Sequence, residues 1–288
     1  MNIGFVGLGT MGFPIAINII RKSGYKAYGF DVLDRQCDRF AEAGGTVCSV
    51  EDVYKKSDIV FLSLPSNRLV SENLLLAVKN CKPGTVVVDL SSSYPAVIQA
   101  VAAEAEKAGI ELMDCPISGG EPGAIAGTLA AMCGGEDTVI ERVRPLLEMF
   151  CTTVTHMGPL GCGYTAKLAN NMIVGVEIAA IAEAFAFAEK AGLNKQRLFD
   201  AIHKGGAGSS VLEIKGPKMI AHDYVPSSKL LIHMKDQQNA LLMGKEIGAA
   251  MPVTGLVTEI MEKLAEVGRQ DEDVANVLDY FEDEEQGV

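Results

Sequence analysis

Residues 2–12 read Asn-Ile-Gly-Phe-Val-Gly-Leu-Gly-Thr-Met-Gly, an apolar strand pattern followed at once by a glycine-rich loop. The loop, Gly7-Leu8-Gly9-Thr10-Met11-Gly12, has the spacing G-x-G-x-x-G. In such a loop the first glycine permits a tight turn, the second lets backbone amides approach a pyrophosphate, and the third allows a helix to pack closely on the strand. The N-terminus of that helix then faces the anion with free N–H groups. Taken alone, the hexad is equally typical of a glycine-rich turn that binds nothing.

An acidic residue stands where a dinucleotide site needs one. Asp31 lies nineteen residues after Gly12, at the end of the second apolar run. A carboxylate there accepts hydrogen bonds from the adenosine ribose and repels a 2′-phosphate, which favours NAD(H). Arg35 lies close enough in sequence to leave NADP(H) possible, and the alternative role for Asp31 is a turn cap. Together the loop and the acid predict dinucleotide binding.

Strand-length apolar runs recur in the first half and alternate with amphipathic helical stretches. The predicted strands are Ile3–Val6, Ala27–Phe30, Ile59–Leu64, Thr85–Leu90 and Glu111–Asp114, and helices such as Met11–Lys22, Arg35–Ala43 and Pro95–Ala108 lie between them. Strands that alternate with helices indicate βαβ units, and hence a parallel sheet covered on both faces. The carboxyl ends of such strands form the ligand crevice of an open parallel sheet.

The pattern changes near Gly158. The stretch Tyr164–Ala191 lacks proline and is apolar nearly all round, which predicts a long buried helix. Beyond it we expect helices over Lys195–Lys204, Ser210–Ala221, Met234–Glu246 and Thr254–Val267. The predicted fold is therefore α/β: a Rossmann dinucleotide-binding domain over residues 1–160, followed by an all-α domain over 161–288 built on a long interdomain helix.

Composition narrows the classes of function. With 48% hydrophobic residues, 22% charged residues and a net charge of −12, the 288-residue chain is typical of soluble globular proteins and unsuited to broad contact with nucleic acid. The seven cysteines are never closer than eleven positions and the four histidines are scattered, so we expect free thiols and no metal site. We find no targeting segment or membrane span and expect a cytoplasmic protein. Eight acidic residues in Asp271–Val288 suggest a solubilising tail, from which we infer no partner.

Two polar features of the second half are candidate binding groups. Ser118-Gly119-Gly120 offers a hydroxyl and unobstructed amides that suit a carboxylate, although a flexible loop is the plainer interpretation. Lys167 lies early in the apolar helix, with Asn170 and Asn171 three and four residues later on the same face. Such groups are costly to bury unless they meet polar partners, and burial favours a neutral amine that can exchange protons near neutrality. The alternative is a lysine that reaches solvent from the helix end.

Taken together, these motifs resemble the β-hydroxyacid dehydrogenase family. The matching stretches keep the family order and cover almost the whole chain: residues 4–14, Leu64-Pro65, Asp89–Ser92, Asp114–Pro122, residues 127–129, Gly161–Asn171 and Lys235-Asp236. The resemblance implies an active site in the cleft between the two domains, with Lys167 as general acid and base. It also implies that a set of polar and glycine residues holds the substrate: Ser118, Gly119, Gly120, Asn170, Asn171 and Lys235.

The resemblance extends to the cofactor and the assembly. The residues implied to lie along the dinucleotide are Gly7, Leu8, Gly9, Thr10, Met11, Gly12, Asp31, Leu64, Pro65, Ser92 and Lys235. On sequence grounds alone, Lys235-Asp236 would be taken for a surface ion pair. Family members are commonly dimers or tetramers, which implies a homodimer or homotetramer here.

The implied activity is NAD(P)-dependent hydride transfer on a short β-hydroxy acid or semialdehyde that carries a carboxylate. Residues 118–122 and 201–212 are most similar to tartronate semialdehyde (2-hydroxy-3-oxopropionate) reductases. Where relatives often place Phe three residues after a proline, this chain has Ser228 or Lys229, so 3-hydroxyisobutyrate, 4-hydroxybutyrate or a sulfonated aldehyde remains an alternative substrate. Two other classes are a methyltransferase, disfavoured by Gly12, and a non-catalytic dinucleotide sensor, disfavoured by the presence of both Lys167 and Asn171.

Overall fold

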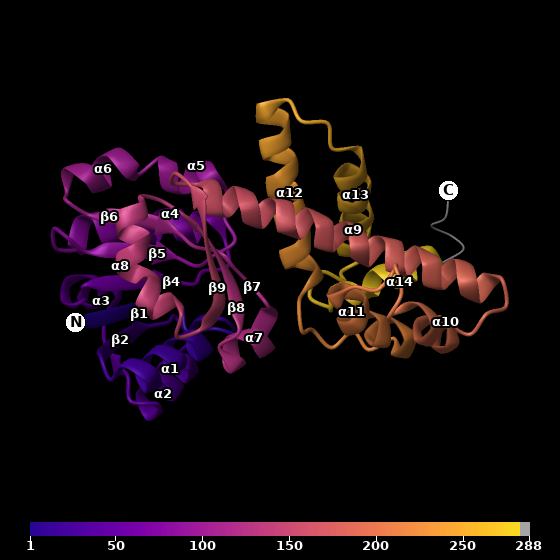
Figure 1. The fold of residues 1–288 in the computed structure, drawn as a ribbon, viewed down its shortest axis with the longest axis horizontal. Coiled ribbons are helices and arrows are strands. Elements are labelled where there is room, and N and C mark those ends of the chain that lie inside the picture. The colour runs from indigo at the N-terminus through magenta and orange to yellow at the C-terminus, as the bar shows by residue number, and fades with distance from the viewer. Residues whose placement is uncertain (283–288) are drawn as a thin grey trace. The chain divides into compact units, whose positions relative to one another are not determined.

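The computed structural model describes residues 1–282 of the chain. They form two compact units, of which the first spans Met1–Lys167 and the second begins at Leu168. An α/β unit is followed by a helical unit (Figure 1), which confirms the predicted fold class.

The first unit is built on a nine-stranded sheet with the order β3-β2-β1-β4-β5-β6-β8-β7, in which β9 pairs with β8 (Figure 1). Five junctions, from β3 to β6, are parallel. The strands of this parallel part are β1 (Asn2–Val6), β2 (Lys26–Phe30), β3 (Thr46–Val47), β4 (Ile59–Leu62), β5 (Val86–Asp89) and β6 (Glu111–Asp114). This is the strand order of dinucleotide-binding domains.

Alternate residues of the central strands serve opposite faces of the sheet, as the two-residue period of a strand requires. Ile3 and Phe5 of β1 join one core cluster, whereas Val6 joins the other. The first cluster also takes residues from α1 (Gly12–Ser23), α2 (Asp34–Glu42), α7 (Gly120–Ala126) and α8 (Asp137–Leu147). The second takes residues from α3 (Val50–Lys56), α4 (Asn67–Asn80), α5 (Pro95–Gln99) and α6 (Ala102–Lys107). Both faces are therefore covered by helices.

The far edge of the sheet departs from the expected parallel arrangement. Strand β8 (Leu129–Gly134) runs antiparallel to β6 and to β7 (Ile117–Ser118), and β9 (Cys151–Gly158) runs parallel to β8. Much of β9 is exposed and polar, so the sequence has no apolar run there that would have predicted a strand. The helix expected over residues 95–108 is also divided, because α5 ends at Gln99 and α6 begins at Ala102.

The long helix is α9 (Cys162–Lys190), 29 residues, as the sequence predicted. Within residues 1–282, five helices and one 3₁₀ turn follow it: α10 (Lys195–Ile202), α11 (Ser210–Ala221), α12 (Leu230–Ile247), α13 (Pro252–Glu266), the 3₁₀ turn η1 (Val274–Asn276) and α14 (Val277–Glu282). Ile178, Ala182 and Phe185 of α9 pack in one core cluster with residues of α11, α13 and α14. An 18-residue window of this helix has a mean hydropathy of 1.6, so the helix is long and apolar enough to cross a membrane, but its packing in this cluster marks it as a core helix.

The acidic C-terminal segment is part of the fold through residue 282. Asp273 is fully buried, accepts hydrogen bonds from the Ser227 and Ser228 N–H groups at 2.8 and 3.1 Å, and pairs with the Lys215 amine at 2.8 Å. Burial alone would raise the pKa of Asp273, but the Lys215 ammonium outweighs it and lowers that pKa to about 2. A purely solubilising tail was therefore wrong for these residues, and residues 283–288 lie outside the described part.

Candidate active site

The glycine-rich loop joins β1 to α1, and two of its glycines are required by the protein's own packing. Gly7 has a φ of 91°, and a Cβ on it would lie 2.2 Å from the Ser63 carbonyl oxygen. A Cβ on Gly12 would lie 2.0 Å from the Gly7 carbonyl oxygen. Any side chain at either position would therefore displace the backbone.

Gly9 is different, because a Cβ built there would meet no atom within 4 Å. Packing among the described residues therefore gives no reason for a glycine at this position. At the start of α1, the Phe13 and Ile15 N–H groups donate to the Gly9 and Met11 carbonyl oxygens, and Pro14 has no N–H. Open space beside a glycine loop that leads into a helix fits the pyrophosphate of a dinucleotide, so the loop passes this test for a nucleotide site.

Asp31 follows β2 and lies against the same loop. Its Oδ2 accepts a hydrogen bond from the Leu8 N–H at 2.7 Å, and its Oδ1 accepts one from the Leu33 N–H at 2.9 Å. The carboxylate therefore does hold a turn, as the alternative interpretation expected. Each carboxylate oxygen still has a second lone pair for a ribose hydroxyl, so both roles are compatible.

The other predicted cofactor residues of this unit lie along the same edge of the sheet. Leu64 and Pro65 follow β4, which is adjacent to β1, and Ser92 follows β5, which is adjacent to β4, so both segments leave the carboxyl ends of neighbouring parallel strands. The Leu64 N–H donates to the Ser91 hydroxyl oxygen at 2.8 Å, which links the two segments. Thr10 is exposed, and Met11 precedes the first residue of α1.

Two fully buried carboxylates, to which the sequence gave no role in the site, end β5 and β6 in register with each other. Asp89 accepts hydrogen bonds from the Tyr164 hydroxyl and from the Ser91 N–H. Asp114 accepts the N–H groups of Gly161 and Tyr164 at 2.7 and 2.8 Å. Burial raises the pKa of both carboxyl groups, and these hydrogen bonds partly offset it. The start of α9 is thereby fastened to the sheet.

The Ser118-Gly119-Gly120 turn joins β7 to α7 and is open to solvent at its glycines. Gly119 has a φ of 128° and Gly120 a φ of 62°, two successive positive values that favour glycine. Successive unshielded N–H groups in such a turn can bind an anion. At its other end α7 is held by Asn18 of α1, whose amide donates to the Ala124 carbonyl at 2.8 Å.

Lys167 lies in the second turn of α9 and is buried, with 9% of its surface exposed. That burial contradicts the alternative in which this lysine extends into solvent. Asn171, one helical turn later, is buried to the same degree. A lysine and a carboxamide thus occupy buried positions on a helix that is otherwise largely apolar, as the cost of burying them led us to expect for functional groups.

In the second unit, the polar residues of α9 meet a polar segment of α12. The Asn171 amide donates to Asp236 Oδ2 at 2.5 Å, and the Asn170 amide donates to Asn171 Oδ1 at 2.8 Å. Lys235 Nζ lies 3.0 Å from Asp236 Oδ1, and the Gln237 amide donates to the Asn171 carbonyl at 2.6 Å.

The interpretation of Lys235-Asp236 as a surface ion pair was therefore wrong, because Asp236 is 2% exposed. Sequence reasoning gave no role to Asp236 or Gln237. The sequence feature that could have identified them is the run of polar residues 235–239 inside a predicted helix. Burying such a run is costly unless its polar groups find hydrogen-bond partners.

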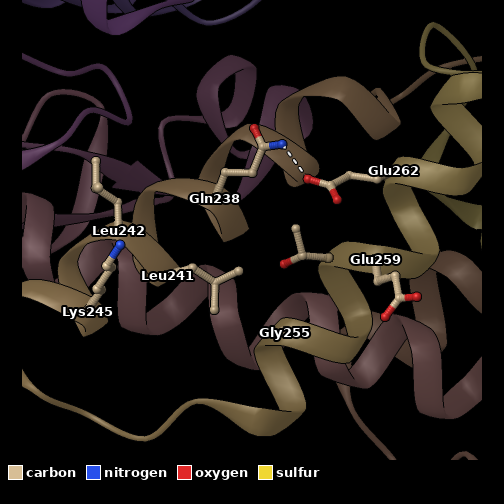
Figure 2. A pocket seen from close by; sticks show the side chains of 8 residues that line it. Gln238, Leu241, Leu242, Lys245, Gly255, Glu259 and Glu262 are labelled. Atoms are coloured by element: carbon tan, nitrogen blue, oxygen red, sulfur yellow. Dashed lines mark hydrogen bonds between the residues drawn. The ribbon is translucent and has the colours of Figure 1, made fainter.

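Two other features of the helical unit do not belong to this set of residues. A groove of about 370 Å³ lies between α12 and α13 (Figure 2), and it is lined by Gln238, Leu241, Leu242, Lys245, Gly255, Thr258, Glu259 and Glu262. None of the predicted site residues lines it, so we assign it no part in the chemistry.

The second feature is a group of possible metal ligands: His222, Asp279 and Glu282, whose ligand atoms lie within 4.8 Å of one another. Arg269 pairs with Asp279 at 2.7 Å, and Lys195 pairs with Glu282 at 2.6 Å. These cations already neutralise the two carboxylates and would repel a metal ion. We assign no metal to this group.

Two family models match successive parts of the chain. A family model described as the NAD binding domain of 6-phosphogluconate dehydrogenase matches residues 2–158. Another, described as NAD-binding of NADP-dependent 3-hydroxyisobutyrate dehydrogenase, matches residues 161–281. The chain belongs to the β-hydroxyacid dehydrogenase family. It is therefore an NAD(P)-dependent oxidoreductase, which confirms the resemblance and excludes the methyltransferase.

Three members of this family each match at least 93% of the chain. It is 36% identical to the 2-hydroxy-3-oxopropionate reductase of Escherichia coli (strain K12), over 93% of this chain and 92% of that one. It is 35% identical to the 2-(hydroxymethyl)glutarate dehydrogenase of Eubacterium barkeri, over 98% and 95%. The solved structure of a Mycobacterium tuberculosis 3-hydroxyisobutyrate dehydrogenase with L-serine has a TM-score of 0.89 at 31% identity, over 98% and 99%. These β-hydroxyacid dehydrogenases act on different acids.

Replacing Gly9 with Ala is expected to weaken cofactor binding without destabilising the fold, because the added methyl group enters the open space beside the loop. We expect the Kd for NADH, measured by titration calorimetry, to rise about tenfold or more. The Tm should stay within about 2 °C of the wild-type value. Gly12→Ala is the matched control and should lower Tm, since its Cβ has no room. An unchanged Kd in Gly9→Ala would contradict a nucleotide site at this loop.

Proposed function

We propose that this β-hydroxyacid dehydrogenase reduces the aldehyde of a short 3-oxo acid with NADH and oxidises the corresponding β-hydroxy acid. Tartronate semialdehyde is the first candidate substrate. The observation that carries the proposal is the burial of Lys167 one helical turn before Asn171, because a buried amine beside a carboxamide suits proton transfer to a bound oxygen. Similarity to a 2-hydroxy-3-oxopropionate reductase supports the choice of substrate.

A bound dinucleotide supplies the hydride in reduction and accepts it in oxidation. In reduction, Lys167 donates a proton to the substrate oxygen as negative charge develops there, so that the carbonyl gains one hydride and one proton. In oxidation Lys167 takes the proton back from the hydroxyl group. We assign the substrate carboxylate to the Ser118 hydroxyl, the amides of Gly119 and Gly120, and Asn171, with Asn170 and Lys235 as further contacts.

The residues proposed to hold the cofactor are loop residues 7–12, Asp31, Leu64, Pro65, Ser92 and Lys235. NADH is favoured because the Asp31 carboxylate stands beside the loop and would repel a 2′-phosphate. All seven cysteines are free thiols, although Cys115 and Cys133 approach to 3.6 Å between sulfurs. Free thiols support the proposed cytoplasmic location.

A second candidate substrate is 3-hydroxyisobutyrate. It is favoured by the family model that matches residues 161–281 and by the similarity to a solved 3-hydroxyisobutyrate dehydrogenase.

The segment before Lys235 bears on the choice between the two substrates. The N–H of Ser228 donates to Asp273, and its hydroxyl contacts His233 Nε2 at 2.8 Å. A polar side chain at this position is consistent with a polar substrate such as tartronate semialdehyde.

A substrate panel assayed with both cofactors tests the assignment. We expect the highest kcat/KM for tartronate semialdehyde reduction with NADH, and a lower value with NADPH, because of the charge on Asp31. The oxidation arm contains glycerate, 3-hydroxyisobutyrate, 2-(hydroxymethyl)glutarate, 4-hydroxybutyrate and L-serine. A higher kcat/KM for 3-hydroxyisobutyrate than for glycerate would replace the first candidate with the second, and a preference for NADPH would refute the role of Asp31.

Replacing Lys167 with Ala should lower kcat by about 10²–10⁴-fold, because the proton donor is lost. The Kd for NADH should change little, since the glycine loop is intact. Lys190→Ala is the matched control: this lysine is exposed at the far end of the same helix, and its loss should leave kcat unchanged. A wild-type kcat in Lys167→Ala would remove this residue from the chemistry.

We infer that the chain forms a homo-oligomer through an apolar stripe on α9, defined by Ile173, Ala180, Ala184 and Phe187. These four exposed residues recur at spacings of seven, four and three positions, which places them on one face of the helix. Ile173 and Phe187 are 63% and 74% exposed and lie equally far from Ala180. Two antiparallel copies would therefore set each Ile against a Phe across a central pair of alanines. Such self-complementarity suits a two-fold contact.

Sedimentation velocity at micromolar concentration should accordingly give a mass of at least twice 30.6 kDa. Ala180→Glu should shift the protein toward monomer, because it brings two like charges together at the centre of the contact. Glu213→Gln alters an exposed residue of α11, outside the stripe, and should leave the mass unchanged. A wild-type monomer of 30.6 kDa would refute the stripe as an interface.

A further inference from the structure

A path of hydrogen bonds connects the end of β4 with the start of α9, and the proposed chemistry uses none of its central members. The Leu64 N–H donates to the Ser91 hydroxyl at 2.8 Å, and the Ser91 N–H donates to Asp89 Oδ1 at 2.9 Å. The other oxygen of Asp89 accepts the Tyr164 hydroxyl. We call these four residues the Asp89 path.

The path is buried and costly. Asp89 and Tyr164 are fully buried, and Ser91 is 5% exposed. Burial raises the pKa of the Asp89 carboxyl and of the Tyr164 phenol, because the charged form of each is disfavoured there. Replacing a buried polar network by apolar residues of the same volume is often neutral or stabilising, so stability alone does not account for this carboxyl group. The two ends of the path, Leu64 and Tyr164, indicate what its hydrogen bonds do.

Each end of the path lies at a proposed functional segment. Leu64 begins the Leu64-Pro65 segment that we assign to the cofactor. Tyr164 lies three residues before Lys167, about 4.5 Å along the helix axis. One carboxyl group, on Asp89, therefore bonds toward both segments, although they are about a hundred positions apart in sequence.

Tyr164 is held at two separate points, which is what fixes the orientation of a helical turn. Its N–H is bonded by Asp114 at 2.8 Å, and its side-chain hydroxyl is bonded by Asp89. Asp114 holds the backbone of this turn through the N–H groups of both Gly161 and Tyr164. The bond at the far end of the Tyr164 ring is a separate point of attachment, and it fixes the direction of the side chain that lies one turn before Lys167.

We propose that Asp89 and Tyr164 are positioning residues, which hold the Leu64 segment and the Lys167 turn in a fixed mutual arrangement through one shared carboxyl group. This inference rests on the proposed function, because it takes Lys167 as the proton donor and Leu64 as a cofactor contact. Neither Asp89 nor Tyr164 is assigned a contact with substrate.

Tyr164→Phe removes only the hydroxyl group and is the direct test. We expect kcat to fall about 10-fold to 100-fold, the cost of a misplaced catalytic group, while KM for the substrate and Kd for NADH stay within about twofold. The matched control is Tyr54→Phe: Tyr54 is also fully buried in the first unit, and its hydroxyl donates to Asn73 at 2.9 Å. Tyr54→Phe should lower Tm and keep the wild-type kcat at 25 °C.

Ser91→Ala tests the other end of the path. It should raise the Kd for NADH, because Leu64 loses its acceptor. The double variant Ser91→Ala/Tyr164→Phe should lose less kcat/KM than the product of the single losses, by about threefold or more, because both act through Asp89. Strictly multiplicative losses would overturn the shared carboxyl group.

The measurements on these variants decide the outcome. A wild-type kcat in Tyr164→Phe, or an equal loss in Tyr54→Phe, overturns the proposal. If Tyr164→Phe does not fold, hydrogen exchange of residues 161–167 in Ser91→Ala replaces it: faster exchange at this distant segment supports the path, and unchanged exchange overturns it. Lys167→Ala separates the two hypotheses, since full activity there refutes the proposed function, whereas full activity in Tyr164→Phe alone refutes only the positioning role.

Discussion

Two backbone N–H groups bonded to one buried carboxylate hold the long helix of this protein to its sheet. Asp114 ends β6 and accepts the N–H groups of Gly161 and Tyr164, at the point where α9 begins. Such groups at a helix start have no partner within the helix, and burying them unpaired would be costly. Because Lys167 follows within the next turn, its place relative to the strand ends depends on this attachment. The bond is structural, yet the chemistry that we assign to the helix requires it.

The parts of the fold that were predictable are those with a strong local signal. Apolar runs on the central strands predicted the parallel sheet, and the unbroken apolar stretch predicted α9, because both elements are buried on most sides. Strands β7 to β9 were missed since two of them are exposed or very short and their pairing is set by distant segments. The same limit hid the bond between Asp89 and Tyr164, residues 75 positions apart that only the finished sheet brings together.

The candidate site likewise has parts that the sequence predicted and parts that it did not. The loop spacing identified three glycines but could not tell that Gly7 and Gly12 serve packing whereas Gly9 faces open space. Lys167 and Asn171 were found from the cost of burying polar groups in an apolar helix, and both are buried. Asp236 was misread, because adjacent opposite charges usually lie at the surface. It is buried since α12 presents it to Asn171, a contact between helices that no local pattern encodes.

The buried pair of Lys215 and Asp273 has a consequence for handling the molecule. The amine belongs to α11 and the carboxylate to the segment just before η1, so this ion pair joins the last described part of the chain to α11. Trimming the acidic terminus back to residue 270, as its composition would invite, removes the carboxylate and leaves an ammonium ion sealed in a core. An affinity tag after residue 288 leaves the ion pair of Lys215 and Asp273 intact, whereas the shortened protein would lack the counter-charge of Lys215 and would be destabilised.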